Sequence, residues 1–188
     1  MTEPGAPSKL GLGGNETVAP LRILDVGTGS GAIAIAIAHH LDQAHITAVD
    51  ISPTALQIAT ANAARHSLAA RIAFIESDLL SALPPEARFD AIVSNPPYIP
   101  ITDRNTLHSQ VRDFEPETAL FAADEGLAIY RRLIPEAYKA LKPGGLLALE
   151  IGHGQREALA ELLAGWNAIR FVDDLQGIPR VVLASKPK

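Results

Sequence analysis

Short apolar runs alternate along this chain with longer stretches whose apolar residues have helical spacing. A run of about six residues suits a buried parallel strand, and a longer amphipathic stretch suits the helix that follows it. We expect strands at 21–26, 45–50, 71–76, 89–94, 146–151, 168–172 and 180–185. We expect helices at 32–41, 52–67, 125–141 and 155–163. The alternation predicts an α/β fold, with a mostly parallel sheet and helices on both faces.

Only the turn at 176–179 joins the last two expected strands, which leaves no room for a helical crossover. These two strands are therefore expected to be antiparallel neighbours. A seven-stranded, mostly parallel sheet with one antiparallel strand near an edge is the Rossmann-like arrangement typical of class I methyltransferases. Residues 1–20 show no helix or strand period, so we expect a flexible leader there and a single domain at 21–188.

The composition suits an ordinary soluble domain, with 188 residues, 47% hydrophobic and 20% charged. The chain has no cysteine, which excludes disulfides and thiolate zinc sites and fits a reducing compartment. It has no apolar run long enough for a membrane span and no secretory signal. The net charge of −5 leans away from a nucleic-acid partner. We therefore expect a cytoplasmic monomer without a metal site or membrane contact.

Three glycines alternate in the segment 25–31, which joins the first expected strand to the first expected helix. Gly27, Gly29 and Gly31 permit a tight turn and let a ligand approach the backbone closely. The helix N-terminus behind them offers free N–H groups that suit a carboxylate or a phosphate. Asp50 ends the second expected strand, where an acid can accept hydrogen bonds from two ribose hydroxyls. These features predict a site for a cofactor that contains adenosine, either S-adenosylmethionine or a dinucleotide.

The segment Asn95–Tyr98 reads Asn-Pro-Pro-Tyr and follows the fourth expected strand, at the sheet edge where open α/β folds bind ligands. The two prolines restrict the backbone, so the Asn95 side chain and the Pro96 carbonyl can be held as two acceptors aimed at one point. A primary amide or amino group has two N–H donors to match them. Such acceptors return electron density to an amide nitrogen and orient its lone pair. Tyr98 can stack on the planar amide, so the segment predicts methyl transfer to nitrogen without a strong general base.

The Asn95–Tyr98 segment resembles the motif of amino-methyltransferases, which act on adenine or on glutamine amides. Other segments narrow the resemblance to the HemK/PrmC-like release-factor glutamine methyltransferases, over residues 21 to about 186. Those segments are Phe114–Phe121, Asp124–Leu127, Tyr130–Arg131, Lys142–Gly145, Glu150–Gly152, Gln155 and Asp174–Val182. Members of this family usually carry an N-terminal helical domain before the glycine turn, so we expect this chain to lack a part that helps to dock the release factor.

The resemblance implies that S-adenosylmethionine is the cofactor and S-adenosylhomocysteine the product. It implies that the substrate is the glutamine of a Gly-Gly-Gln loop in peptide-chain release factors. The implied catalytic residues are Asn95, Pro96 and Tyr98, and Pro97, Phe114 and Glu115 complete the substrate pocket. Asp78, after the third expected strand, is placed to accept a hydrogen bond from the adenine amino group. The residues expected to bind the cofactor are Asp25, Gly27, Thr28, Gly29, Gly31, Asp50, Ile51, Asp78, Leu79 and Asn95.

Three alternatives stay open at this point. An amino-methyltransferase for adenine or guanine in DNA or RNA would use the same loop on a flipped base. A nicotinamide-dependent oxidoreductase would use the glycine turn but would leave Asn95–Tyr98 without a role. A domain that binds the cofactor and is inactive without its docking part would keep both features and transfer no methyl group.

Overall fold

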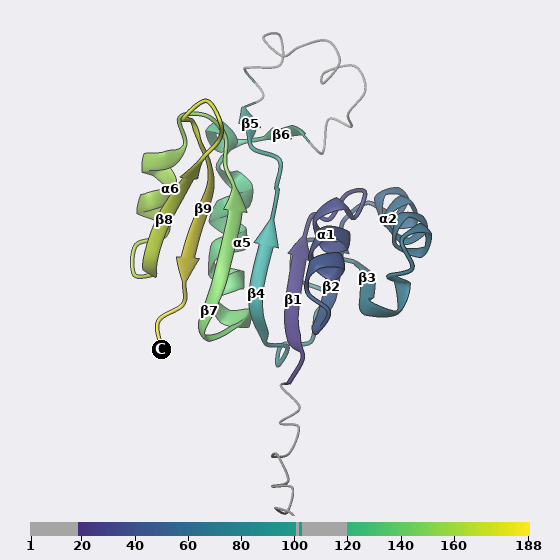
Figure 1. Ribbon diagram of the computed structural model, residues 1–188. Coiled ribbons are helices and arrows are strands. Elements are labelled where there is room, and N and C mark those ends of the chain that lie inside the picture. The colour runs from purple at the N-terminus through teal and green to yellow at the C-terminus, as the bar shows by residue number, and fades with distance from the viewer. Residues whose placement is uncertain (1–18, 101, 103–119) are drawn as a thin grey trace, which may run out of the picture.

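One seven-stranded sheet organises the chain, for which the computed structural model describes residues 19–100, 102 and 120–188. The strand order is β3-β2-β1-β4-β7-β9-β8 (Figure 1). The strands are β1 (Leu21–Val26), β2 (Ala44–Asp50), β3 (Ile72–Glu76), β4 (Phe89–Ser94), β7 (Leu141–Glu150), β8 (Asn167–Asp173) and β9 (Pro179–Ser185). β9 pairs antiparallel with β7 and β8, whereas the other pairs in this sheet are parallel. The predicted sheet with one antiparallel strand is confirmed.

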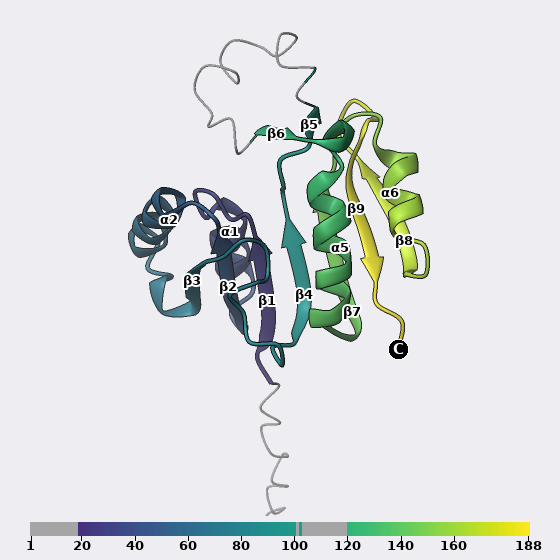
Figure 2. The same ribbon diagram turned by 180° about the vertical axis from the view of Figure 1, so that it is seen from behind.

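Helices cover both faces of the sheet, as predicted. They are α1 (Ala32–His40), α2 (Pro53–Arg65), α5 (Ala128–Ala140) and α6 (Arg156–Leu162), with short 3-10 turns η1 (Ala69–Arg71) and η3 (Asp124–Gly126). α5 and α6 lie in front of the sheet in Figure 2, and their apolar side chains pack with β4, β7 and β9 into one large core. The opposite core, under α1 and α2, contains many alanines, such as Ala34, Ala38 and Ala63. Small side chains there let these helices pack close to β1 and β2.

Local sequence signals explain several element ends. Ser52 adopts extended backbone angles, and its side chain accepts a hydrogen bond from the Ala55 N–H at 3.2 Å, as expected of an N-cap. Pro53 occupies the first helical position of α2, where its missing N–H is not needed. The bounds of β1 and β4 match the predicted ranges. Within the described part of the chain, no helix is long and apolar enough to cross a membrane.

Three segments differ most from the sequence predictions, whereas the other predicted elements agree to within two residues at each end. The helix expected from residue 125 begins at Ala128, because Asp124 and Glu125 have positive φ angles of 55° and 54°. The strand expected from residue 146 begins at Leu141, since Gly144 and Gly145 exchange backbone hydrogen bonds with Lys186 and extend the pairing. A further two-stranded parallel pair, β5 (Ile99–Pro100) with β6 (Phe121–Ala122), was not predicted, because two-residue strands show no periodicity.

The leader and the boundary at residue 21 remain predictions, because residues 1–18 lie outside the described part. The described chain enters β1 at the amino edge of the sheet. The segments that follow β1, β2, β3, β4 and β7 all begin at the opposite, carboxyl edge (Figure 1). The candidate site residues therefore meet at one edge of the sheet, as is usual for open α/β folds.

Candidate functional site at the carboxyl edge

The three glycines of the turn between β1 and α1 serve two different purposes. Gly27, Gly29 and Gly31 all have positive φ, at 69°, 56° and 82°. A Cβ at Gly31 would lie 3.1 Å from the Ala59 Cβ, so this glycine allows α1 and α2 to pack closely. A Cβ at Gly27 or Gly29 would meet nothing within 4 Å. The backbone at these two positions therefore faces open space, as a turn that receives a ligand should.

Asp25 lies at the base of this turn and is completely buried. Its Oδ2 accepts hydrogen bonds from the Thr28 hydroxyl at 2.7 Å and from the Ala34 N–H at 3.1 Å. Its buried Oδ1 has no partner among the residues that the structure describes. Burial raises the pKa of Asp25 to about 6, and the two hydrogen bonds and the nearby Asp50 have smaller effects. An unpaired, buried carboxylate oxygen beside an open turn suits a cationic group of a ligand.

Asp50 connects the carboxyl ends of β1 and β2. Its Oδ2 accepts a hydrogen bond from the Gly29 N–H at 2.8 Å, and its Oδ1 accepts one from the Ser52 N–H at 2.9 Å. Each carboxylate oxygen has a second lone pair, so Asp50 can still accept hydrogen bonds from a diol. Ile51 follows it and is 64% exposed, so its apolar side chain is accessible to a ligand. Together they offer a polar and an apolar surface next to the glycine turn.

Asp78 and Leu79 lie just after the carboxyl end of β3. The Ser77 N–H donates to the Asp50 carbonyl at 2.9 Å, which ties this turn to the end of β2. Asp78 Oδ2 accepts a hydrogen bond from Arg132 of α5 at 2.8 Å, in a half-exposed ion pair. Leu79 has a positive φ of 51° and packs against the larger core. The expected role of Asp78 toward an adenine ring stays a prediction, and Arg132 is its partner in this structure.

The Asn95–Tyr98 loop begins directly beside the glycine turn. Val26 and Ser94 are paired residues on β1 and β4, so the next residues, Gly27 and Asn95, lie next to each other at the same edge. The buried Ser94 hydroxyl donates to the Val26 carbonyl at 2.7 Å and fixes the start of the loop. Asn95 is exposed, and its side chain has no hydrogen-bond partner among the residues that the structure describes. Its amide is therefore available to a ligand in front of the glycine turn.

The far end of the loop is held by β7 and the residues after it. The Tyr98 hydroxyl donates to Glu150 Oε1 at 3.0 Å, and the Tyr98 carbonyl accepts from Gln155 Nε2 at 3.1 Å. The fully buried Tyr130 donates to the Glu150 carbonyl at 2.7 Å. Burial, with Tyr98 and Glu150 nearby, raises the pKa of Tyr130 above its usual range, so its hydroxyl stays a donor. Tyr98 is therefore oriented by Glu150, the last residue of β7.

The structure brings together most of the predicted site residues, but it also adds supports that the residue pattern did not indicate. Phe114 and Glu115 lie outside the described residues, so their place in a substrate pocket stays a prediction. Ser94 was placed at the end of the fourth expected strand and the start of the loop but was given no role, and Glu150 and Gln155 entered only through the family resemblance. A polar residue at the carboxyl end of a predicted buried strand was the one signal that would have pointed to Ser94 and Glu150.

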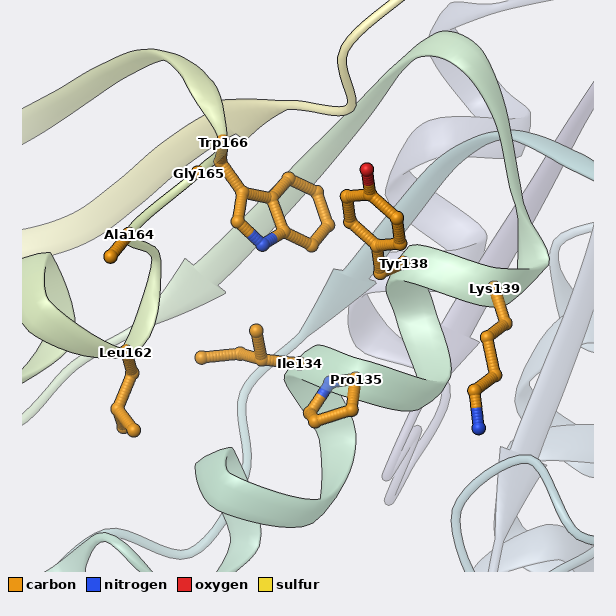
Figure 3. A pocket seen from close by; sticks show the side chains of 8 residues that line it. All are labelled: Ile134, Pro135, Tyr138, Lys139, Leu162, Ala164, Gly165 and Trp166. Carbon is orange, nitrogen blue, oxygen red and sulfur yellow. The ribbon is translucent and has the colours of Figure 1, made fainter.

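A separate hollow lies away from this edge (Figure 3). It has a volume of about 390 Å³ and is formed by the C-terminal half of α5 and the segment before β8. The rings of Tyr138 and Trp166 meet edge to face inside it, with centroids 5.3 Å apart. None of the predicted site residues within the described part of the chain lines this hollow, so we do not take it as the candidate site.

The sheet order, the glycine turn with its two acids and the loop after β4 define a class I methyltransferase. A model of the family described as methyltransferase small domain matches residues 15–112, just over half of the chain, and the chain belongs to this family. The solved structure of a ribosomal protein L11 methylase from Lactobacillus delbrueckii subsp. bulgaricus has a TM-score of 0.63 and 26% identity to it. That match covers 91% of this chain and 73% of the other.

Curated relatives confirm the resemblance seen in the sequence. The release factor glutamine methyltransferase of Koribacter versatilis is 49% identical over 165 residues, which are 88% of this chain and 58% of that protein. The protein of the same name from Rhodopirellula baltica is 42% identical over 167 residues, which are 87% of this chain and 56% of that protein. The chain therefore spans somewhat over half the length of the curated relatives that it matches.

Proposed function

We propose that this chain transfers a methyl group from S-adenosylmethionine to the side-chain amide nitrogen of a glutamine in a protein. The proposed substrate is the Gly-Gly-Gln loop of a peptide-chain release factor. The observation that carries the proposal is the exposed Asn95 amide, held beside the open backbone of Gly27 by the pairing of β1 with β4. The names of relatives that are 49% and 42% identical support the choice of substrate.

The residues of the glycine turn fit S-adenosylmethionine better than a dinucleotide. The cofactor carries positive charge on its sulfonium and its amino group, and the unpaired, buried Oδ1 of Asp25 is a suitable counter-charge. A pyrophosphate would instead bring negative charge toward Asp25 and Asp50. In the proposed complex, Asp50 accepts hydrogen bonds from the ribose hydroxyls. The exposed Ile51 covers one face of the adenine ring, and Asp78 accepts from its amino group.

The loop residues would position and polarise the substrate amide. The Asn95 side-chain oxygen and the Pro96 carbonyl accept the two amide N–H groups, which returns electron density to the nitrogen. Tyr98 packs on one face of the amide plane and shields that face from water. The amide nitrogen forms a bond to the methyl carbon as the bond from that carbon to sulfur breaks, and the electron pair of that bond stays on sulfur. One amide proton is then lost to water, because the methylated nitrogen is briefly cationic.

Methyl transfer from labelled cofactor to a purified release factor tests this proposal. We expect label in the wild-type factor and none in a factor whose loop Gln is replaced by Ala. Asn95→Ala should lower the rate of transfer at least about 100-fold. Because Asn95 is also expected to contact the cofactor, the cofactor affinity measured by calorimetry should fall too, but by much less than the rate. A single-stranded oligonucleotide that contains adenine serves as the second substrate. Label in the oligonucleotide and none in the protein would replace the proposal with a nucleic-acid methyltransferase. Cofactor binding with no transfer to either would show that this stretch of chain is insufficient for activity.

A further inference from the structure

Neighbouring backbone packs very closely around Tyr98, and above all around its carbonyl oxygen. A Cβ at Gly126 would lie 2.1 Å from the Tyr98 oxygen, and one at Gly152 would lie 3.0 Å from the Tyr98 Cδ2. Two chain segments, one before α5 and one after β7, thus touch Tyr98 with bare backbone. Such close approach is possible only where the neighbouring residues lack side chains.

Gln155 completes this close packing with its side-chain amide. It is only 8% exposed and lies at the N-cap of α6. Its Oε1 accepts from the Gly152 N–H at 2.9 Å, and its Nε2 donates to the carbonyls of Tyr98 at 3.1 Å and Glu125 at 3.3 Å. Both N–H donors of this buried amide are therefore used, and each of them reaches a different segment of the chain. A side chain needed only to cap α6 would have no reason to contact the loop after β4.

The two ends of the Asn95–Tyr98 loop are anchored independently. Ser94 fixes the start through its 2.7 Å bond to the Val26 carbonyl, and Gln155 fixes the carbonyl at the end. The rings of Pro96 and Pro97 fix two of the φ angles between these anchors. With both ends and these angles set, few backbone rotations are left to redirect the acceptors at Asn95 and Pro96.

We infer that Gln155 is a positioning residue for methyl transfer: by holding the Tyr98 carbonyl, it keeps the acceptors of Asn95 and Pro96 aimed at the substrate amide. Gly126 supports the same position, because only a residue without a Cβ leaves room for the Tyr98 carbonyl. This inference rests on the proposed function for its kinetic consequence, but the restraint on the loop can be measured without it. A displacement of about 1 Å at a reacting group costs on the order of 100-fold in rate.

Gln155→Glu separates the two functions of this side chain. It keeps an acceptor for the Gly152 N–H but replaces the donors to Tyr98 and Glu125 with a carboxylate oxygen that faces two carbonyls. We expect kcat to fall about 10- to 100-fold, with cofactor Kd within about twofold, because the glycine turn is held by other bonds. A role confined to folding would instead lower the melting temperature and leave kcat per folded molecule unchanged.

Gly126→Ala tests the same contact from the opposite side, with Gly165→Ala as its control. Both glycines have positive φ, 85° and 92°, so both variants carry similar backbone strain. A Cβ at Gly165 meets nothing within 4 Å, whereas one at Gly126 would displace the Tyr98 carbonyl. Gly126→Ala should lower kcat as Gln155→Glu does, and Gly165→Ala should leave kcat unchanged.

Hydrogen exchange of the backbone amides at Tyr98 and Ile99 supplies the readout that needs no substrate. Faster exchange in Gln155→Glu and Gly126→Ala, but not in Gly165→Ala, would support the restraint even if the wild-type protein methylated no release factor. Unchanged exchange, or unchanged kcat in an active wild-type background, would overturn the inference. The failure of the proposed function and the failure of this inference are therefore distinguishable.

Discussion

The two halves of the site are held together in contrasting ways. In the glycine turn, the side-chain bonds join residues at most 32 positions apart: Thr28 to Asp25 across 3, Ala34 to Asp25 across 9, Gly29 to Asp50 across 21 and Asn62 to Ser30 across 32. In the Asn95–Tyr98 loop, Ser94 reaches Val26 across 68 positions and Gln155 reaches Tyr98 across 57. Within the cofactor half, the glycine turn thus depends on β1, β2 and the helices next to them, and Asp78 is held from farther away, by Arg132 across 54 positions. The substrate half requires β1, β4 and β7 to be assembled. Substitutions should therefore separate cofactor binding from methyl transfer.

The largest difference between the effect on methyl transfer and the effect on cofactor binding is expected for a substitution at Asn95. Asn95→Ala removes one of the two proposed acceptors without touching any bond that holds the loop, since its side chain has no partner among the described residues. We expect kcat to fall at least about 100-fold, as when one preorganised hydrogen bond is lost from a catalytic site. Calorimetry should give a cofactor Kd that changes far less than kcat does, since the bonds of Asp25 and Asp50 in the glycine turn stay intact. Equal losses in kcat and in cofactor affinity would mean that the two halves are not independent.

Asp25→Asn should affect the cofactor half of the site, through the stability of the protein and the affinity for the cofactor. The pKa of Asp25 is about 6 in the folded protein against an ordinary 3.8. The folded state therefore binds the proton more tightly than the unfolded state, and the free energy of unfolding falls as pH rises from about 4 to about 6. Asn carries no charge, so the free variant should be more stable than wild type by up to about 3 kcal/mol at neutral pH and similar to it near pH 4. Thermal or urea unfolding across this range measures the difference.

The same substitution should weaken cofactor binding although it stabilises the free protein. If the charged carboxylate faces the cation, wild-type affinity rises about tenfold between pH 5 and pH 7, as the proton leaves Asp25. Asp25→Asn should bind more weakly at neutral pH and show no such rise. Titration calorimetry at several pH values provides the comparison. A wild-type affinity that does not change with pH would show that Asp25 does not serve as the counter-charge.

A moderate effect on both halves is expected at Ser94, where they are joined. Ser94→Ala leaves the buried Val26 carbonyl without the 2.7 Å hydrogen bond, which should cost about 1–3 kcal/mol of stability. Because the bond also anchors the loop, kcat should fall several-fold more than cofactor affinity does. Ser94→Thr, which retains a hydroxyl, is the matched control. Equal kcat values in the two variants would show that this hydrogen bond does not position the loop.

The smallest effect is expected from Tyr98→Phe. The ring remains available to stack on an amide, and only the 3.0 Å bond to the Glu150 carboxylate is lost. That bond is partly exposed, so we expect a loss of about 0.5–1.5 kcal/mol in stability and less than about tenfold in kcat. Tyr98→Ala, which removes the ring, should lower kcat much further. If the two variants were equally impaired, the hydroxyl rather than the ring would be the important group.

The same contrast explains how far the sequence could predict this molecule. Alternating glycines, a capping serine and short apolar runs are local signals, so β1, β4, the α2 N-terminus and the glycine turn were predicted closely. The residues that hold the loop are not marked locally: a glutamine 57 positions from Tyr98 looks like any polar helix start. The start of α5 was misplaced for a related reason. Asp124 and Glu125 have positive φ angles and the next residue, Gly126, lies against the Tyr98 carbonyl, a contact that the local sequence does not reveal.

The return of β9 toward the amino edge has a practical consequence. Lys186, which follows β9, exchanges backbone hydrogen bonds with Gly144 and Gly145 of β7, and its Nζ donates to the Leu141 carbonyl at 2.8 Å. The last residues are therefore held far from the Asn95–Tyr98 loop (Figure 1). A fluorophore or surface tether attached at Lys188 would point away from the proposed reaction. A layer of molecules immobilised through that residue would present the glycine turn and the amide-binding loop outward, in one common orientation, to any protein passing in solution.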